Sequence, residues 1–232
     1  MKRPRSHRGT FRNSFTPFGT SVLGAPLEVW NPASGNVRTL LVGGQHGEEP
    51  EGTYLLSRAL RSLSADPHEC AIVLAANPDG LARGTRANAN GVDLNRNFPT
   101  ADWQPDPVTY SWYTGSGSEV HLSPGSSPGS EPETAAFIAL VEALQPERII
   151  TLHAPLACID DPLLSPLGQH LATATGLPLI NHIGYPTPGS LGTWAAERNL
   201  HVITYELPRG PLDQLCQLHS PLLCALMTGG LP

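Results

Sequence analysis

Short runs of branched apolar residues alternate with helical patterns along the chain, and this alternation is the strongest constraint on its fold. The apolar runs predict buried strands at 38–44, 71–77, 148–153, 177–180 and 201–207. The intervening patterns predict helices at 50–63, 131–144, 165–176 and 189–199. Strands that alternate with helices are typical of an α/β protein, so we expect one sheet with helices on both faces.

Two of the expected helices carry recognisable start signals. Pro50 stands at a first-turn position, among acidic residues that favour the positive end of a helix. Ser130 is a candidate N-cap for the next helix, because Glu133 follows three residues later in the capping-box spacing.

The bulk properties indicate one domain and exclude several classes of function. A chain of 232 residues that is 40% hydrophobic can fill one core, so we expect a single domain over 1–232 with a flexible arm at 1–12. Its net charge of −6 disfavours nucleic acid as a partner. No apolar stretch is long enough for a signal peptide or a membrane span, so we expect a cytoplasmic protein without a membrane partner. The four cysteines show no C-x-x-C spacing and are interpreted as buried, reduced thiols.

The segment 100–129 fits neither a helix nor an ordinary flexible linker. It combines tryptophans and tyrosines with several prolines. Long ordered loops of this kind often serve as binding loops or lids. A surface insertion packed by its own aromatic residues is an equally good interpretation.

Polar residues follow several of the predicted strands where each strand ends. They are His46 and Glu49 after the first strand, the segment 77–80 after the second, His153 after the third and Glu206 after the last. Ligands of open α/β sheets bind beyond the carboxyl ends of the strands. These residues are therefore the first candidates for a functional site.

His46, Glu49 and His153 together offer the ligand types of a catalytic zinc site. Two imidazoles and one carboxylate leave a fourth position open for water. The H-x-x-E pair alone is a weak signal, because His46 could cap a turn and Glu49 could serve the helix dipole.

Hydrolysis also needs a proton acceptor and a stabiliser of negative charge. Glu206 is placed to act as general base and acid, although it could instead pair with Arg209. Arg86 and Arg96 lie in "RGTRANANGVDLNRNFP", and arginine is suited to gripping a carboxylate. That segment could equally be a solvated loop.

At this point five motifs, in order along the chain, resemble the zinc carboxypeptidase family. They are "HGEE", "ANPDG", "GVDLNRNFP", "TLH" and "TYEL", which correspond to the family's H-x-x-E, N-P-D-G, D-x-N-R-N, third-ligand and catalytic-glutamate segments. The resemblance implies a single-domain three-layer α/β/α fold with a central mixed sheet, and one Zn²⁺ per chain.

The resemblance also implies roles for individual residues. His46, Glu49 and His153 would bind the zinc ion. Glu206 would be the general base and acid, and Arg86 would stabilise the oxyanion together with the metal.

The same resemblance also implies substrate-binding roles. Asn95 and Arg96 would hold a terminal carboxylate, and Tyr185 matches a substrate-capping tyrosine by its spacing from a tryptophan. We further expect Asp160 or Asp161 in "ACIDD" to attract an ammonium group at the far end of the substrate's side chain. Alternatively, these two residues only begin a turn before a proline.

Within the family, "RANANGVDLNRNFP", "PGSEPET", "PLACIDDP" and "GYPTPGSLGTW" resemble the murein peptide amidase branch. That branch hydrolyses the γ-D-glutamyl-meso-diaminopimelate bond of murein peptides in peptidoglycan recycling. The expected partner is thus a small murein peptide, bound by a monomer or homodimer. The alternatives are a general metallocarboxypeptidase, an aminoacylase-type hydrolase and a non-catalytic, zinc-dependent binder of cell-wall fragments. Retention of Glu206 and all three ligands disfavours the last.

Overall fold

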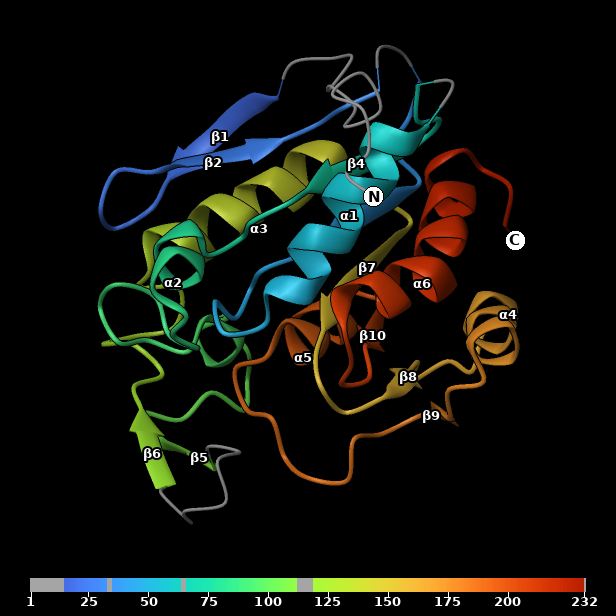
Figure 1. The fold of residues 1–232 in the computed structure, drawn as a ribbon. Helices are drawn as coiled ribbons and strands as arrows, with labels where there is room; N and C mark the ends of the chain where they lie inside the picture. The colour runs from blue at the N-terminus through green and yellow to red at the C-terminus, as the bar shows by residue number, and fades with distance from the viewer. Residues whose placement is uncertain (1–14, 33–34, 64–65, 112–118, 232) are drawn as a thin grey trace.

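A six-stranded sheet forms the centre of the molecule (Figure 1). The structure is a computed structural model that describes residues 15–32, 35–63, 66–111 and 119–231. The expected arm at 1–12 lies outside these described residues. From one edge to the other, the sheet contains β4 (Cys70–Val73), β3 (Thr39–Val42), β7 (Arg148–His153), β10 (His201–Glu206), β8 (Cys158–Asp160) and β9 (Leu179–Ile180).

The sheet is mixed, as the resemblance implied. Strands β4, β3, β7 and β10 run parallel, whereas β8 runs antiparallel to β10 and parallel to β9. The carboxyl ends of β3, β7 and β10 therefore meet at one edge, as the strand order requires. The three-residue strand β8 was not predicted, because so short a run carries almost no periodicity.

Helices cover both faces of this sheet, which confirms the three-layer α/β/α prediction. Helices α1 (Pro50–Ser62), α4 (Pro166–Thr175) and α6 (Leu212–Met227) pack on one face, where Leu56, Leu171 and Leu223 belong to the same buried apolar cluster as Ile150 of the sheet. Helices α3 (Pro132–Leu144) and α5 (Leu191–Ala196) pack on the other. Figure 1 shows α1 and α6 side by side along β7 and β10. Alternate residues of each strand face the two cores, which is why the buried strands read as continuous apolar runs.

The helix starts agree with the sequence at one position and differ at another. Helix α1 begins at Pro50, as expected. The prediction of Ser130 as an N-cap is wrong, because α3 begins at Pro132 and its N-cap is Glu131. The hydroxyl of Ser130 instead donates a hydrogen bond to Glu131 at 2.8 Å and accepts one from Asn97.

Several described elements were not predicted from the sequence. They are α2 (Pro78–Arg83), the hairpin of β1 (Thr16–Thr20) and β2 (Pro26–Val29), the hairpin of β5 (Val108–Ser111) and β6 (Glu119–Leu122), and α6. Helix α6 contains Pro221 in its interior, a residue that normally ends or kinks a helix. Burial of Leu215, Leu223 and Met227 against the rest of the core keeps it helical.

The segment 100–129 contains the β5–β6 hairpin, which extends away from the sheet at the lower left of Figure 1. Its residues Val108 and Thr109 line the main cavity of the described chain. The segment thus contributes to the wall of a pocket, as a binding loop would.

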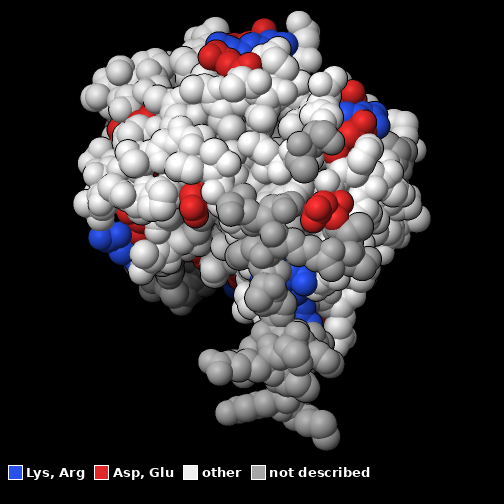
Figure 2. Space-filling view, turned by 90° about the horizontal axis from the view of Figure 1, so that it is seen from above, with Lys and Arg blue, Asp and Glu red and all other residues white. Residues whose placement is uncertain are grey.

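Charged side chains are sparse and scattered on the face shown in Figure 2, where they form small separate groups. Within the described ranges, no helix has both the length and the apolar character that crossing a bilayer requires.

Candidate active site

The carboxyl ends of three parallel strands bring the predicted residues together. His153 and Glu206 are the last residues of β7 and β10, and they are direct register partners in the parallel pair. His46 lies in the loop after β3, the other neighbour of β7, and Glu49 is the N-cap of the helix that follows. The topology alone therefore places all four side chains at one point on the sheet edge.

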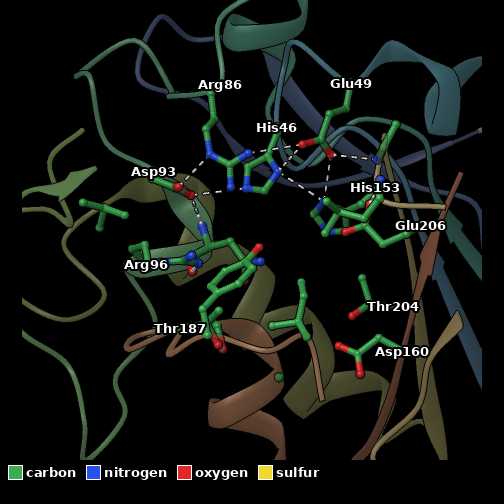
Figure 3. Close-up of a pocket in the computed structure, with 18 of the residues that line it drawn as sticks. His46, Glu49, Arg86, Asp93, Arg96, His153, Asp160, Thr187, Thr204 and Glu206 are labelled. Carbon is green, nitrogen blue, oxygen red and sulfur yellow. Dashed lines mark hydrogen bonds and ion pairs between the residues drawn. The ribbon is translucent and has the colours of Figure 1, made fainter. Parts of the chain in front are cut away.

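His46, Glu49 and His153 form a compact, buried set of donor atoms (Figure 3). Nδ1 of His46 and Nδ1 of His153 are 3.2 Å apart, and each lies 2.8 Å from an oxygen of Glu49. All three residues are buried. The side chain of Glu49 makes no capping hydrogen bond to α1, so it serves the site and not the helix start. These three are the potential metal-binding group of the described residues.

The geometry of this group fits a zinc ion. Nε2 of His46 faces a carboxylate oxygen of Asp93 at 3.3 Å, so the ring proton belongs on Nε2. The lone pair of Nδ1 is then directed at Glu49 and His153, as a metal ligand requires. Burial opposes ionisation of Glu49, yet the two imidazoles hold the pKa of its carboxyl well below the ordinary value. An ionised carboxylate and two imidazole nitrogens are the donors zinc prefers.

Asp93 is a site residue that the sequence interpretation missed. It is fully buried just before the 3-10 helix Leu94–Arg96, and one of its oxygens accepts a hydrogen bond from the backbone N–H of Asn95. Its other oxygen accepts one from Nε of Arg86 at 2.9 Å. Its position in "GVDLNRN", two residues before Asn95, was the only available signal.

Arg86 lies beside the metal group, on the loop after α2. Its NH1 is 3.3 Å from Glu49 and 3.5 Å from Glu48. Burial opposes its charge, but Asp93 and Glu49 raise the pKa of the guanidinium above its ordinary value. Arg86 is therefore a fixed, fully charged donor next to the proposed reaction centre.

Glu206 faces the same cavity from the neighbouring strand. It is 6% exposed, and one of its oxygens accepts a hydrogen bond from the backbone N–H of Leu156 at 3.3 Å. Burial raises the pKa of this carboxyl above its ordinary value, while His153 opposes that shift. A carboxylate with a raised pKa is a better proton acceptor near neutral pH than an exposed one.

Asn95 and Arg96 lie on the other side of the cavity. Oδ1 of Asn95 accepts a hydrogen bond from the backbone N–H of Leu191, which leaves its NH₂ group as the donor. Arg96 is 7% exposed, and its Nε is buried without an acceptor in the described part of the chain. Burial lowers the pKa of this guanidinium. An anion in the cavity would satisfy both donors.

One cavity of about 400 Å³ joins these groups. It is lined by His46, Glu49, Arg86, Asp93, Asn95, Arg96, His153, Tyr185 and Glu206, among others. Tyr185 is half exposed and lies in the loop between β9 and α5. The volume is ordinary for a pocket that takes a small ligand.

The two aspartates of "ACIDD" occupy different environments. Asp160 lines the cavity, whereas Asp161 is fully buried and is not among the lining residues. Asp161 accepts hydrogen bonds from Ser165, Leu163 and His201, and so forms the turn that leads into α4. The alternative interpretation, a turn before a proline, therefore applies to Asp161.

Gly47 explains how His46 and Glu49 fit into so short a loop. A Cβ added at this position would collide with the backbone of Gly80 in the "NPDG" segment. The loop that carries His46 and Glu49 thus packs directly against the backbone at the start of α2, which only glycine allows.

Comparison with known proteins agrees with this geometry. Murein peptide amidase A of Escherichia coli (strain K12) is 48% identical over 211 residues, covering 90% of this chain and 87% of the relative. That of Vibrio campbellii is 41% identical over 227 residues, covering 97% and 91%. The crystal structure of the murein-tripeptide amidase MpaA from Escherichia coli O157 has a TM-score of 0.91 at 44% identity, covering 97% and 96%.

More distant structures share the fold alone. Bovine thrombin-activatable fibrinolysis inhibitor, in complex with tick carboxypeptidase inhibitor, has a TM-score of 0.73 at 19% identity, over 92% of this chain and 88% of that one. Residues 13–159 match the family described as zinc carboxypeptidase. With its buried His-Glu-His donors at the ends of parallel strands, the chain belongs to the zinc carboxypeptidase family.

Proposed function

We propose that this protein is a zinc-dependent murein peptide amidase that hydrolyses the γ-D-glutamyl-meso-diaminopimelate bond of L-Ala-γ-D-Glu-meso-diaminopimelate. The observation that carries the proposal is the register of the sheet, which sets Glu206 directly beside the metal ligand His153. Identities of 48% and 41% to relatives named murein peptide amidase A support the choice of substrate.

His46, Glu49 and His153 would hold one zinc ion through two Nδ1 atoms and a carboxylate. A zinc ion held by three protein ligands supplies a Lewis acid and a water of lowered pKa. The ligands lie at one wall of the cavity, next to Glu206 and Arg86.

Glu206 would accept a proton from the attacking water and later deliver it to the departing amine. Its burial and raised pKa suit both transfers, because the carboxyl must gain and lose the proton within one cycle. Arg86 would donate to the oxygen that becomes negative in the transition state. Asp93 fixes the guanidinium of Arg86 in advance, so little reorganisation is needed when that charge develops.

Arg96 and Asn95 would hold the carboxylate next to the scissile amide. In the tripeptide, diaminopimelate presents a free α-carboxylate there, as a C-terminal residue does. The buried, unsatisfied Nε of Arg96 supports this role, since a carboxylate would supply the missing acceptor. Tyr185 lines the rim of the cavity and would cover the bound peptide.

We further propose that the enzyme serves peptidoglycan recycling in the cytoplasm. The substrate is a small released peptide, not the intact wall. The four cysteines are free thiols, as is usual in reducing compartments.

The proposal is tested by adding the tripeptide to the purified protein and following release of diaminopimelate. We expect hydrolysis that stops on chelation and returns with zinc. Cleavage of ordinary L,L-peptides in preference to the γ-D-glutamyl substrate would instead indicate a general carboxypeptidase.

Glu206→Gln tests the catalytic assignment. We expect kcat to fall by roughly 10³-fold or more, because the base is lost, while zinc and substrate still bind. Glu142→Gln on the exposed side of α3 is the matched control and should behave as the unchanged protein. Full activity in Glu206→Gln would contradict the role.

A further inference from the structure

Two arginines and one aspartate lie on opposite sides of the cavity. Arg86 and Arg96 lie on one side, whereas Asp160 lies on the other side together with Thr204 (Figure 3). The proposed function uses the cationic side to bind a carboxylate and leaves the anionic side without a role. Diaminopimelate carries a second amino group at the far end of its side chain, and such a ligand needs a partner there.

Asp160 has one buried carboxylate oxygen. Its Oδ1 is buried and receives no hydrogen bond from the described residues. Burial, and next the charge of Asp161, raise the pKa of this carboxyl. A buried carboxylate oxygen without a partner is costly, so a cationic ligand that fills the cavity would gain by pairing with it.

The register of the sheet sets where Asp160 lies relative to Glu206. Asp160 on β8 is the antiparallel partner of Thr204 on β10, so the two side chains lie on the same face. Thr204 stands two residues before Glu206, again on that face. Asp160 and Thr204 are thus displaced from the catalytic carboxylate by about 7 Å along β10.

This displacement matches the length of the substrate side chain. Five bonds separate the α-carbon of diaminopimelate from its distal nitrogen, a span of about 6 Å when extended. With the scissile amide beside Glu206 and the α-carboxylate at Arg96, the extended side chain reaches Asp160 and Thr204.

We propose that Asp160, with the hydroxyl of Thr204, forms the subsite that binds the distal ammonium group of the substrate and makes the enzyme selective for a side chain with a distal ammonium group after the scissile bond. This inference rests on the proposed function. It also gives the two aspartates of "ACIDD" different roles. Asp160 binds the substrate, whereas Asp161 accepts the hydrogen bonds of the turn before α4. A threonine hydroxyl accepts a hydrogen bond from an ammonium group and adds no competing charge.

The test compares three L-Ala-γ-D-Glu tripeptides that end in meso-diaminopimelate, lysine or norleucine. Lysine keeps the distal ammonium, whereas norleucine has the same four side-chain carbons but lacks the ammonium. With the zinc-loaded protein, we expect kcat/KM to be at least about 10-fold higher for the two peptides with a distal ammonium group than for the norleucine peptide.

Asp160→Asn should then remove the preference. We expect kcat/KM for the diaminopimelate and lysine peptides to fall at least about 10-fold, mainly through KM, because the amide keeps the shape but loses the charge. The ratio of kcat/KM between the lysine and norleucine peptides should therefore fall towards one. Asp213→Asn, on an 88% exposed side chain of α6, is the matched control and should preserve the full preference.

Each outcome separates the two proposals. If none of the three peptides is cleaved by the zinc-loaded protein, the proposed function fails, and this subsite fails with it. If the peptides are cleaved but the unchanged protein does not distinguish lysine from norleucine, the subsite is wrong while the amidase function stands. The subsite is likewise wrong, and the amidase function stands, if Asp160→Asn still prefers the lysine peptide to the norleucine peptide. The comparison within the unchanged protein decides the question even if the variant does not fold.

Discussion

Nε2 of His46 lies 3.3 Å from a carboxylate oxygen of Asp93, and the second oxygen of that carboxylate accepts a hydrogen bond from Arg86. One buried residue thus orients both the proposed metal ligand His46 and the arginine proposed to stabilise the transition state. Although burial opposes its ionisation, Arg86 and His46 hold the pKa of Asp93 well below its ordinary value, so the carboxylate stays charged.

Asp93→Asn is therefore expected to weaken zinc binding by roughly 10- to 100-fold, as is usual when a carboxylate behind a ligating histidine is neutralised. Competition with a chromogenic chelator measures this directly. Asp213→Asn removes an exposed carboxylate and serves as the control. Unchanged zinc affinity in Asp93→Asn would show that His46 is held by the rest of the loop.

Substitution of the two arginines of the cavity should affect different kinetic constants. Arg96→Lys is expected to raise KM at least about 10-fold with a smaller effect on kcat, because lysine cannot grip a carboxylate with two parallel hydrogen bonds. Arg86→Lys should act mainly on kcat, since its contact strengthens in the transition state. Steady-state kinetics on the tripeptide gives both constants, and Arg198→Lys on the surface is the control. Equal effects of both changes on KM alone would contradict the division of roles.

Gly47→Ala should disturb the proposed metal site, although Gly47 offers no ligand atom of its own. The added methyl group collides with the backbone of Gly80, so the loop that carries His46 and Glu49 must move. We expect a loss of about 1–3 kcal/mol in unfolding free energy and weaker zinc binding. Urea denaturation and chelator competition measure the two effects. Gly210→Ala is the control, since a Cβ there meets nothing closer than 3.9 Å. If both variants behave alike, the close approach is unimportant.

The buried pair of Tyr205 and His219 predicts a pH-dependent stability. The Tyr205 hydroxyl and Nδ1 of His219 share a hydrogen bond of 2.6 Å, and burial lowers the pKa of this histidine. The unfolded state therefore binds more protons, so the contribution of His219 is fully present above about pH 6.5. It is lost as the pH falls from there through the lowered pKa.

His219→Gln keeps an acceptor for the tyrosine but does not titrate. Urea unfolding of the metal-free protein between pH 5 and 8 should show a smaller loss of stability on acidification in this variant than in the unchanged protein. His68→Gln is the control, because the His68 side chain is 70% exposed. Identical pH dependence in His219→Gln and the unchanged protein would rule out this contribution.

The layers of the fold and the strand ends that build the site could be predicted from the amino-acid sequence alone. Continuous apolar runs followed by His46, Glu49, His153 and Glu206 predicted where polar groups must gather, because parallel strands end at one edge. These signals are local in the chain, so they can be read without knowing which strands are neighbours. The order of the family motifs then supplied the chemistry.

Contacts between segments distant in the sequence became visible in the folded chain and not before. The tertiary structure identified Asp93 as the link between His46 and Arg86, and it placed α6 on the core despite Pro221. It also directed Asp160 into the cavity and Asp161 into a turn, although the two are adjacent and chemically alike. In each case the outcome depends on strand register and burial against partners far along the chain, which no local pattern records.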